Sequence, residues 1–210
     1  MTGIINLEAF IVTALIVVTT PGIDTIMVLT RSISKGKKAG LYSALGVSLG
    51  LIFHTCAVTF GLSLIIAQSA VAFGIIKYLG AAYLIYIGLK SLLSKSEQTE
   101  IKATNIKITG MRKMFLTAFL SDVLNPKIAI FFLAFLPQFI QPTEINNPVP
   151  YLLLGLIMFF ITLIWCAFLA LMGSKVAVLF NKNKKTESWL NKTSGIVFIL
   201  LGLKVALTKK

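Results

Sequence analysis

The chain has 210 residues, of which 57% are hydrophobic and only 13% are charged. Soluble domains carry roughly 45–50% apolar and about 25% charged residues, so this composition excludes a disordered chain and an ordinary soluble enzyme. The net charge of +13 would point to nucleic acid in a soluble protein, but here the charges lie between apolar segments and no nucleic-acid partner is predicted. We predict an all-α, polytopic membrane protein in a lipid bilayer.

Six apolar segments follow one another along the chain, and a membrane-spanning helix needs about 20 apolar residues. We therefore predict six transmembrane helices, at residues 6–32, 40–66, 70–93, 113–139, 149–180 and 187–207. Cys56 and Cys166 lie inside apolar segments without a C-x-x-C motif, so we expect them to pack in the interior. No metal site and no cofactor are predicted.

Lysine and arginine alternate between the gaps that separate these segments. They occur in the first, third and fifth gaps, at residues 31–38, 95–113 and 182–185, and are absent from the gap near Gln68 and from residues 141–150. Loops rich in positive charge stay on the cytoplasmic side. We therefore predict that the three basic gaps are cytoplasmic and that the N-terminus and the C-terminus both lie outside.

The two halves of the chain resemble each other. The third segment contains Gly88-Leu89-Lys90 and the sixth contains Gly202-Leu203-Lys204, while Pro21 and Pro126 interrupt the first and fourth segments. With three spans in each half, the second half enters the membrane in the opposite sense, which gives the inverted 3+3 repeat of many secondary transporters. We predict a first repeat at residues 1–93, a cytoplasmic linker at residues 94–112 and a second repeat at residues 113–210.

The two prolines should break their helices, because proline cannot donate a hydrogen bond to the carbonyl four residues earlier. Gly22 adds freedom beside Pro21. In hydrocarbon a carbonyl left free must find another partner or line a cavity. A packing kink is the simpler explanation for one proline, but two corresponding breaks near carboxylates favour a binding site.

Three charged residues lie close to these breaks. Asp24 and Asp122 fall a few residues to the cytoplasmic side of the centres of their spans, where a charge costs about 2.5–3.5 kcal/mol and therefore points to a function. Lys127 needs a partner, and Asp24 in the other half suits it better than Asp122, five residues away on the same helix. Asn125 should share a helix face with Asp122. The alternative is that both acids lie among lipid headgroups.

The motifs around these residues resemble those of a known family. Pro21-Gly22-Ile23-Asp24 is similar to the P-G-x-D motif of the LysE/RhtB family, the bacterial lysine and homoserine–threonine exporters. Asn125-Pro126-Lys127 and Leu136-Pro137-Gln138-Phe139 resemble its N-P-K segment and L-P-Q-F exit. The resemblance covers essentially the whole chain. Many members have proline in place of Ile23, and they often have a neutral residue in place of Asp122. The second departure points to a more cationic substrate or an additional proton site.

The resemblance implies a transporter, not an enzyme, that exports amino acids or close derivatives across the bacterial inner membrane and uses the proton gradient. We expect its site between the first and fourth spans, where the helix end after Gly22 attracts the carboxylate of an amino acid. Asp24 or Asp122 would take the ammonium group or a proton. The full set of expected site residues is Pro21, Gly22, Asp24, Asp122, Asn125, Pro126 and Lys127. The identity of the amino acid and a homo-oligomeric state are left open.

Two other functions remain open at this point. An intramembrane lipid-modifying enzyme needs a nucleophile with a base, or an arginine cluster on phosphate, whereas Arg31 and Arg112 are the chain's two arginines, both expected at the cytoplasmic rim. An exporter of ions or soft metals would favour clusters of cysteine or histidine, which the sequence lacks. His54, the single histidine, either relays protons or donates a hydrogen bond to a neighbouring helix.

Overall fold

The computed structural model describes residues 3–20, 22–68, 70–93, 110–182 and 184–207, and helices make up nearly all of this part of the chain. The helices are α1 (Leu7–Thr19), α2 (Ile23–Lys35), α3 (Lys37–Gln68), α4 (Ala70–Leu93), α5 (Met111–Val123), α6 (Pro126–Phe135), η1 (Leu136–Phe139), η2 (Pro142–Glu144), α7 (Pro148–Lys182) and α8 (Lys184–Leu207). The prediction of an all-helical protein is confirmed. Pro21 and most of the predicted linker lie outside the described residues.

Two pairs of helices form bent rods. α1 with α2, and α5 with α6, each bend by 53° at a break of at most four residues. At the second break Pro126 takes the first position of α6, where its missing N–H costs no helix hydrogen bond. The side-chain oxygen of Asn125 caps α6 by accepting a hydrogen bond from the backbone nitrogen of Lys127 at 3.1 Å. The break predicted at Pro126 is therefore confirmed.

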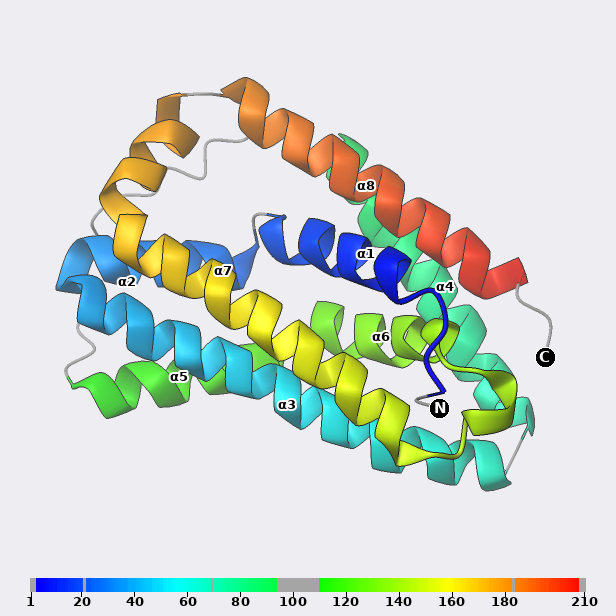
Figure 1. The fold of residues 1–210 in the computed structure, drawn as a ribbon. Helices are drawn as coiled ribbons and strands as arrows, with labels where there is room; N and C mark the ends of the chain where they lie inside the picture. The colour runs from blue at the N-terminus through cyan, green and yellow to red at the C-terminus, as the bar shows by residue number, and fades with distance from the viewer. Residues whose placement is uncertain (1–2, 21, 69, 94–109, 183, 208–210) are drawn as a thin grey trace.

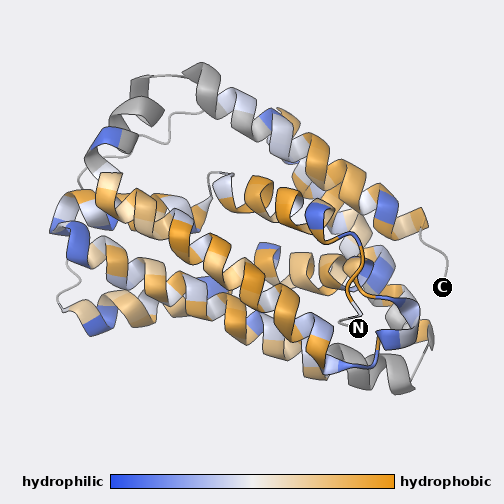
Figure 2. Cartoon of the chain, in the orientation of Figure 1, coloured by the Kyte–Doolittle hydropathy of each residue, from blue (hydrophilic) through white to orange (hydrophobic). Residues whose placement is uncertain are grey.

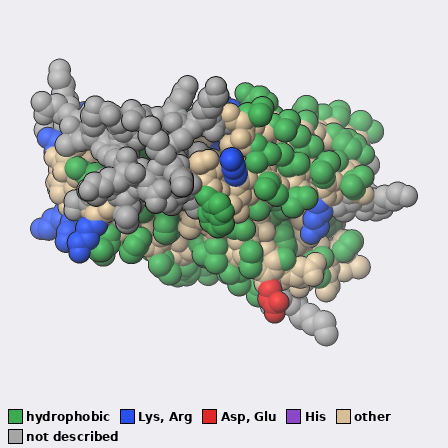
Figure 3. All heavy atoms as spheres, turned by 90° about the horizontal axis from the view of Figure 1, so that it is seen from above, with side chains coloured by type: hydrophobic (Ala, Val, Ile, Leu, Met, Phe, Trp, Pro, Cys, Tyr) green, Lys and Arg blue, Asp and Glu red, His purple; other side chains and the backbone are tan. Residues whose placement is uncertain are grey.

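The described helices include several that are able to cross a membrane. Lys37–Gly61 in α3 and Pro148–Gly173 in α7 are long and apolar enough, and each bent pair adds one span if it is counted as a single rod. The described residues thus supply two to four candidate spans, and α4 and α8 run beside them in the same bundle (Figure 1). Hydrophobic residues dominate the helices (Figure 2) and cover most of the described surface seen in Figure 3.

Glycines bring α4 and α8 into direct backbone contact. A Cβ atom on Gly88 would lie 2.7 Å from the carbonyl oxygen of Gly195, and one on Gly195 would lie 2.7 Å from the carbonyl oxygen of Gly88. A Cβ atom on Gly202 would lie 2.8 Å from the carbonyl oxygen of Ala81. Such close approach is typical of small residues between membrane helices. The two helices run antiparallel (Figure 1).

Two apolar clusters lie on opposite sides of the helix breaks. The first contains residues before the break in α1 and after it in α6, and includes the phenylalanines Phe10, Phe131, Phe132, Phe135, Phe139 and Phe198. The second contains residues after the break in α2 and before it in α5, together with parts of α3 and α7. Cys166 is buried in this second cluster as a free thiol, as the sequence led us to expect. The polar residues at the breaks therefore lie between two apolar layers.

Candidate functional site

The two helix breaks meet in the middle of the bundle. Lys127, in the first turn of α6, reaches Gly22 at the start of α2: a Cβ atom on Gly22 would lie 4.0 Å from the lysine Nζ. Both helices begin here, and a helix N-terminus carries a partial positive charge. The side of the region formed by Lys127 and the N-termini of α2 and α6 is therefore electrically positive.

Asp24 lies in the first turn of α2 and faces this positive region. Its electrostatic partners are the ammonium group of Lys127 and the side chain of Asn125. No hydrogen-bond partner among the described residues reaches its Oδ1 atom. The ammonium group of Lys127 lies over the ring of Phe198, 5.1 Å from the ring centroid. Asp24 and Lys127 are thus neighbours across the two halves of the chain without forming a close ion pair.

Asp122 is in a different environment, at the end of α5 and against α3. It is 1% exposed, and neither carboxylate oxygen has a hydrogen-bond partner among the described residues. A Cβ atom on Gly50 would lie 2.7 Å from the Cβ of Asp122, so the α3 backbone closes directly over this side chain. Asp122 is close enough to Asp24 to be affected by its charge.

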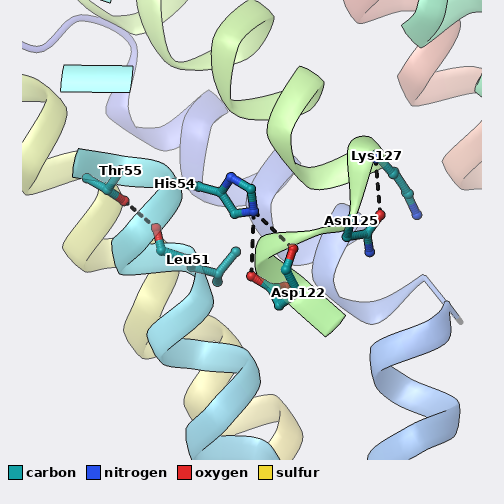
Figure 4. A network of polar contacts seen from close by, with 6 residues as sticks. All are labelled: Leu51, His54, Thr55, Asp122, Asn125 and Lys127. Atoms are coloured by element: carbon teal, nitrogen blue, oxygen red, sulfur yellow. Dashed lines mark hydrogen bonds and ion pairs between the residues drawn. The ribbon is translucent and has the colours of Figure 1, made fainter. Parts of the chain in front are cut away.

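His54 on α3 completes the surroundings of Asp122 (Figure 4). Its Nε2 atom lies 3.0 Å from the backbone carbonyl oxygen of Asp122 and 3.9 Å from the carboxylate Oδ2. A carbonyl oxygen only accepts hydrogen bonds, so Nε2 carries the hydrogen and donates it. This is the carbonyl that Pro126 leaves without its usual helix partner. His54 therefore makes the hydrogen bond to a neighbouring helix that was one of its two expected roles.

One expectation, about Asn125, was wrong, and Arg31 is more buried than its place in the sequence indicated. An unbroken helix would place Asn125 and Asp122 on one face, but α5 ends at Val123 and Asn125 has extended backbone. Arg31, which was expected at the cytoplasmic rim, is only 6% exposed within the protein. Its guanidinium group donates to Ser43 Oγ at 3.0 Å, to the Met114 carbonyl at 2.7 Å and to Thr117 Oγ1 at 2.9 Å.

Helix α7 forms a further wall of the site that sequence reasoning missed. Cys166 interacts electrostatically with both acids, and one turn earlier the buried Thr162 hydroxyl has no hydrogen-bond partner among the described residues. The spacing of Thr162 and Cys166 puts them on one helix face, which is the signal that the sequence offered. The described residues contain no group of three or more His, Cys, Asp or Glu side chains that could hold a metal ion.

Comparison with known proteins gives matches over nearly the full length of the chain. The sequence profile of a family described as LysE type translocator matches residues 15–209. A Bacillus subtilis (strain 168) protein named uncharacterized membrane protein YrhP is 36% identical over 211 residues, which cover 97% of this chain and 99% of that protein. The leucine efflux protein of Salmonella choleraesuis (strain SC-B67) is 30% identical over 207 residues, 97% of this chain and 96% of that protein.

The leucine efflux protein of Salmonella typhimurium (strain LT2) matches equally well, with 30% identity over 207 residues, 97% of this chain and 96% of that protein. No solved structure matches the chain.

Proposed function

Because the chain belongs to the family of LysE type translocators, we propose that it exports an amino acid or a close derivative from the bacterial cytoplasm. It acts as a secondary transporter coupled to the proton gradient, and not as an enzyme. It resides in the cytoplasmic membrane with both termini outside. The observation that carries this proposal is the pair of opposite charges, Asp24 and Lys127, held beside each other at the two helix breaks without direct pairing.

A free amino acid matches this arrangement because it carries a carboxylate and an ammonium group on one carbon. The ammonium group of Lys127 and the N-termini of α2 and α6 attract the substrate carboxylate. Asp24 attracts the substrate ammonium, and its free Oδ1 atom is available to accept a hydrogen bond from it. The side-chain oxygen of Asn125 accepts the hydrogen bond that caps α6. Its amide N–H groups are therefore the donors that face Asp24.

The six-span inverted repeat is part of the same proposal, with α4 and α8 as the two remaining spans. When the Gly-Leu-Lys tripeptides are aligned, Gly88 corresponds to Gly202 and Ala81 corresponds to Gly195. An internal two-fold axis would relate the contact of Gly88 with Gly195 to a contact of Gly202 with Ala81. Both contacts are present between α4 and α8. The equal 53° bends of the two broken rods support the repeat as well.

Leucine is the first substrate to test, because the relatives from Salmonella are named leucine efflux proteins. A lipid-modifying enzyme is disfavoured because three of the five N–H donors of Arg31 are already taken by Ser43, Thr117 and a carbonyl. Arg112 is exposed elsewhere on α5, so the arginines form no phosphate-binding cluster.

The proposal is tested by efflux from cells preloaded with labelled leucine, threonine or lysine, with and without a protonophore. The wild type should release at least one of them, and the protonophore should slow the release. Asp24→Asn and Lys127→Met should each abolish this efflux, while Lys90→Met, at an exposed lysine on α4, should not. Unchanged efflux in both site variants, or no efflux of any amino acid by the wild type, would refute the proposal.

A further inference from the structure

The two buried acids differ in what surrounds them. Asp24 has a cation nearby, in Lys127, and an amide in Asn125. Asp122 has neither: the titratable or charged groups that face it are His54 on α3, Asp24 on α2 and Cys166 on α7. A carboxylate inside a bilayer is costly unless it is paired or carries a proton. Asp122 is therefore the acid that lacks a cation in the described part of the protein.

The space around Asp122 decides which cation fits. The side chain is 1% exposed, and on one side the Gly50 backbone leaves no room even for a methyl group, which would lie 2.8 Å from Asp122 Cγ. A substrate ammonium group has about the size of a water molecule, so the Gly50 backbone leaves no room for it on that side of the carboxylate. A proton adds no volume beyond a hydrogen atom.

We propose that Asp122 is the proton-binding site of the exchange and that His54 positions it, separately from the substrate site at Asp24 and Lys127. This inference rests on the proposed function. His54 donates a hydrogen bond from Nε2 to the Asp122 carbonyl oxygen at 3.0 Å. The same nitrogen lies 3.9 Å from the carboxylate Oδ2 of Asp122. The imidazole thereby orients the end of α5 and stands beside the carboxylate on which the proton resides.

We assign the coupling to the charge of Asp24, which acts on Asp122. Two nearby carboxylates resist being ionised together. When a substrate ammonium neutralises Asp24 from the cytoplasmic side, Asp122 releases its proton more readily. When the amino acid leaves on the external side, the charge of Asp24 returns and Asp122 takes a proton from outside. One amino acid moves out as one proton moves in, and by linkage each ligand weakens the binding of the other.

The test uses the purified full-length protein in liposomes, with labelled leucine and a pH-sensitive dye inside. Counterflow of leucine at equal pH on both sides reports the substrate site, and accumulation driven by a pH gradient reports coupling. In the wild type the KM for leucine should rise as the pH falls, because a proton on Asp122 opposes ammonium binding at Asp24. Asp122→Asn should keep counterflow with a KM that no longer depends on pH and is raised about tenfold at high pH. It should lose pH-driven accumulation.

Two variants of His54 keep the inference testable if Asp122→Asn fails to fold. Glutamine retains an N–H donor for the Asp122 carbonyl, whereas alanine does not. We expect His54→Ala to shift the pH at which the KM changes and His54→Gln to restore the wild-type profile. Size-exclusion chromatography identifies any variant that is misfolded.

Each result has a distinct meaning. Loss of counterflow in folded Asp122→Asn, or pH-driven accumulation at the wild-type level, would overturn the separate proton site. Identical pH profiles for the wild type and His54→Ala would overturn the positioning role of His54. Counterflow without any proton movement in the wild type would overturn the inference and the proposed proton coupling, and would leave the proposed export of an amino acid intact. No counterflow of leucine, threonine or lysine would overturn the proposed export and this inference with it.

Discussion

Replacing Gly88 by alanine should destabilise the protein, although alanine is the better helix former. The added methyl carbon would lie 2.6 Å from Ile199 Cγ1, 2.7 Å from the Gly195 carbonyl oxygen and 2.9 Å from the Ile199 nitrogen. Two of these three atoms belong to the α8 backbone. Restoring an ordinary distance of 3.4 Å therefore requires α4 and α8 to separate by about 0.7 Å, which a densely packed interface resists.

The size of the effect follows from two opposing contributions. Overpacking of this kind costs about 1–3 kcal/mol, while the change from glycine to alanine inside a helix stabilises by roughly 0.5–1 kcal/mol. The central values, about 2 and about 0.75 kcal/mol, leave a net loss of about 1 kcal/mol in the free energy of unfolding. This corresponds to a Tm lower by roughly 2–4 °C for a chain of this size. Gly61 is the matched control, because a Cβ atom there meets nothing within 4 Å.

The assay is thermal unfolding in detergent, followed by intrinsic fluorescence. Gly61→Ala should raise the Tm, and Gly88→Ala should lower it. The double variant Gly88→Ala with Gly195→Ala should cost less than the sum of the single variants, because the first substitution has already separated the helices. An equal rise in Tm for Gly88→Ala and Gly61→Ala would refute the close backbone contact between α4 and α8.

Three further predictions concern other parts of the bundle. Arg31→Lys should lower stability by about 1.5–3 kcal/mol in the same assay, because a lysine keeps the charge but loses the planar guanidinium group that reaches several acceptors. Arg112→Lys, at an exposed position, should leave stability unchanged. Equal effects of the two substitutions would contradict the buried hydrogen bonds of Arg31. Asn125→Ala should cost about 1 kcal/mol by removing the α6 cap, and Asn125→Ser, which keeps an uncharged capping oxygen, should recover most of it; a neutral alanine variant would contradict the cap. Single cysteines that replace Lys37 and Asn146 should be labelled from opposite sides of the membrane, and the cysteine at Asn146 should react from outside intact cells. Labelling from outside at Lys37 but not at Asn146 would reverse the proposed orientation.

The sequence was sufficient to predict the parts of the fold that depend on local chemistry. Apolar segments of spanning length predicted the helices, and Pro126 predicted the break between α5 and α6 because proline cannot continue a helix hydrogen-bond ladder. The same local view predicted that Asp24 and Lys127 would be neighbours, since two buried opposite charges are stabilised by each other. The structure gives Lys127 the charge of Asp24 as its electrostatic partner.

The remaining features depend on how helices pack, which a single sequence does not contain. The periodicity of α5 cannot reveal that Asp122 turns toward Gly50, because that direction is set by the rotation of the helix against α3. Arg31 looked like a rim residue because it precedes a basic loop. It is buried because α3 and α5 both supply oxygen acceptors to it, and neither acceptor is near it in sequence.

Because Asp24 and Lys127 are neighbours in the folded protein, the interval between their synthesis matters for membrane insertion. The aspartate and its cation are separated by about 100 residues, which a ribosome adds in roughly 5–20 s. During that interval the first broken rod enters the membrane with an acid whose counter-charge has not yet been synthesised. We expect the arrival of Lys127 with α6 to stabilise α1 and α2 in the membrane, because a buried acid is less costly beside a cation. The second half of the chain would then act as the intramolecular partner of the first.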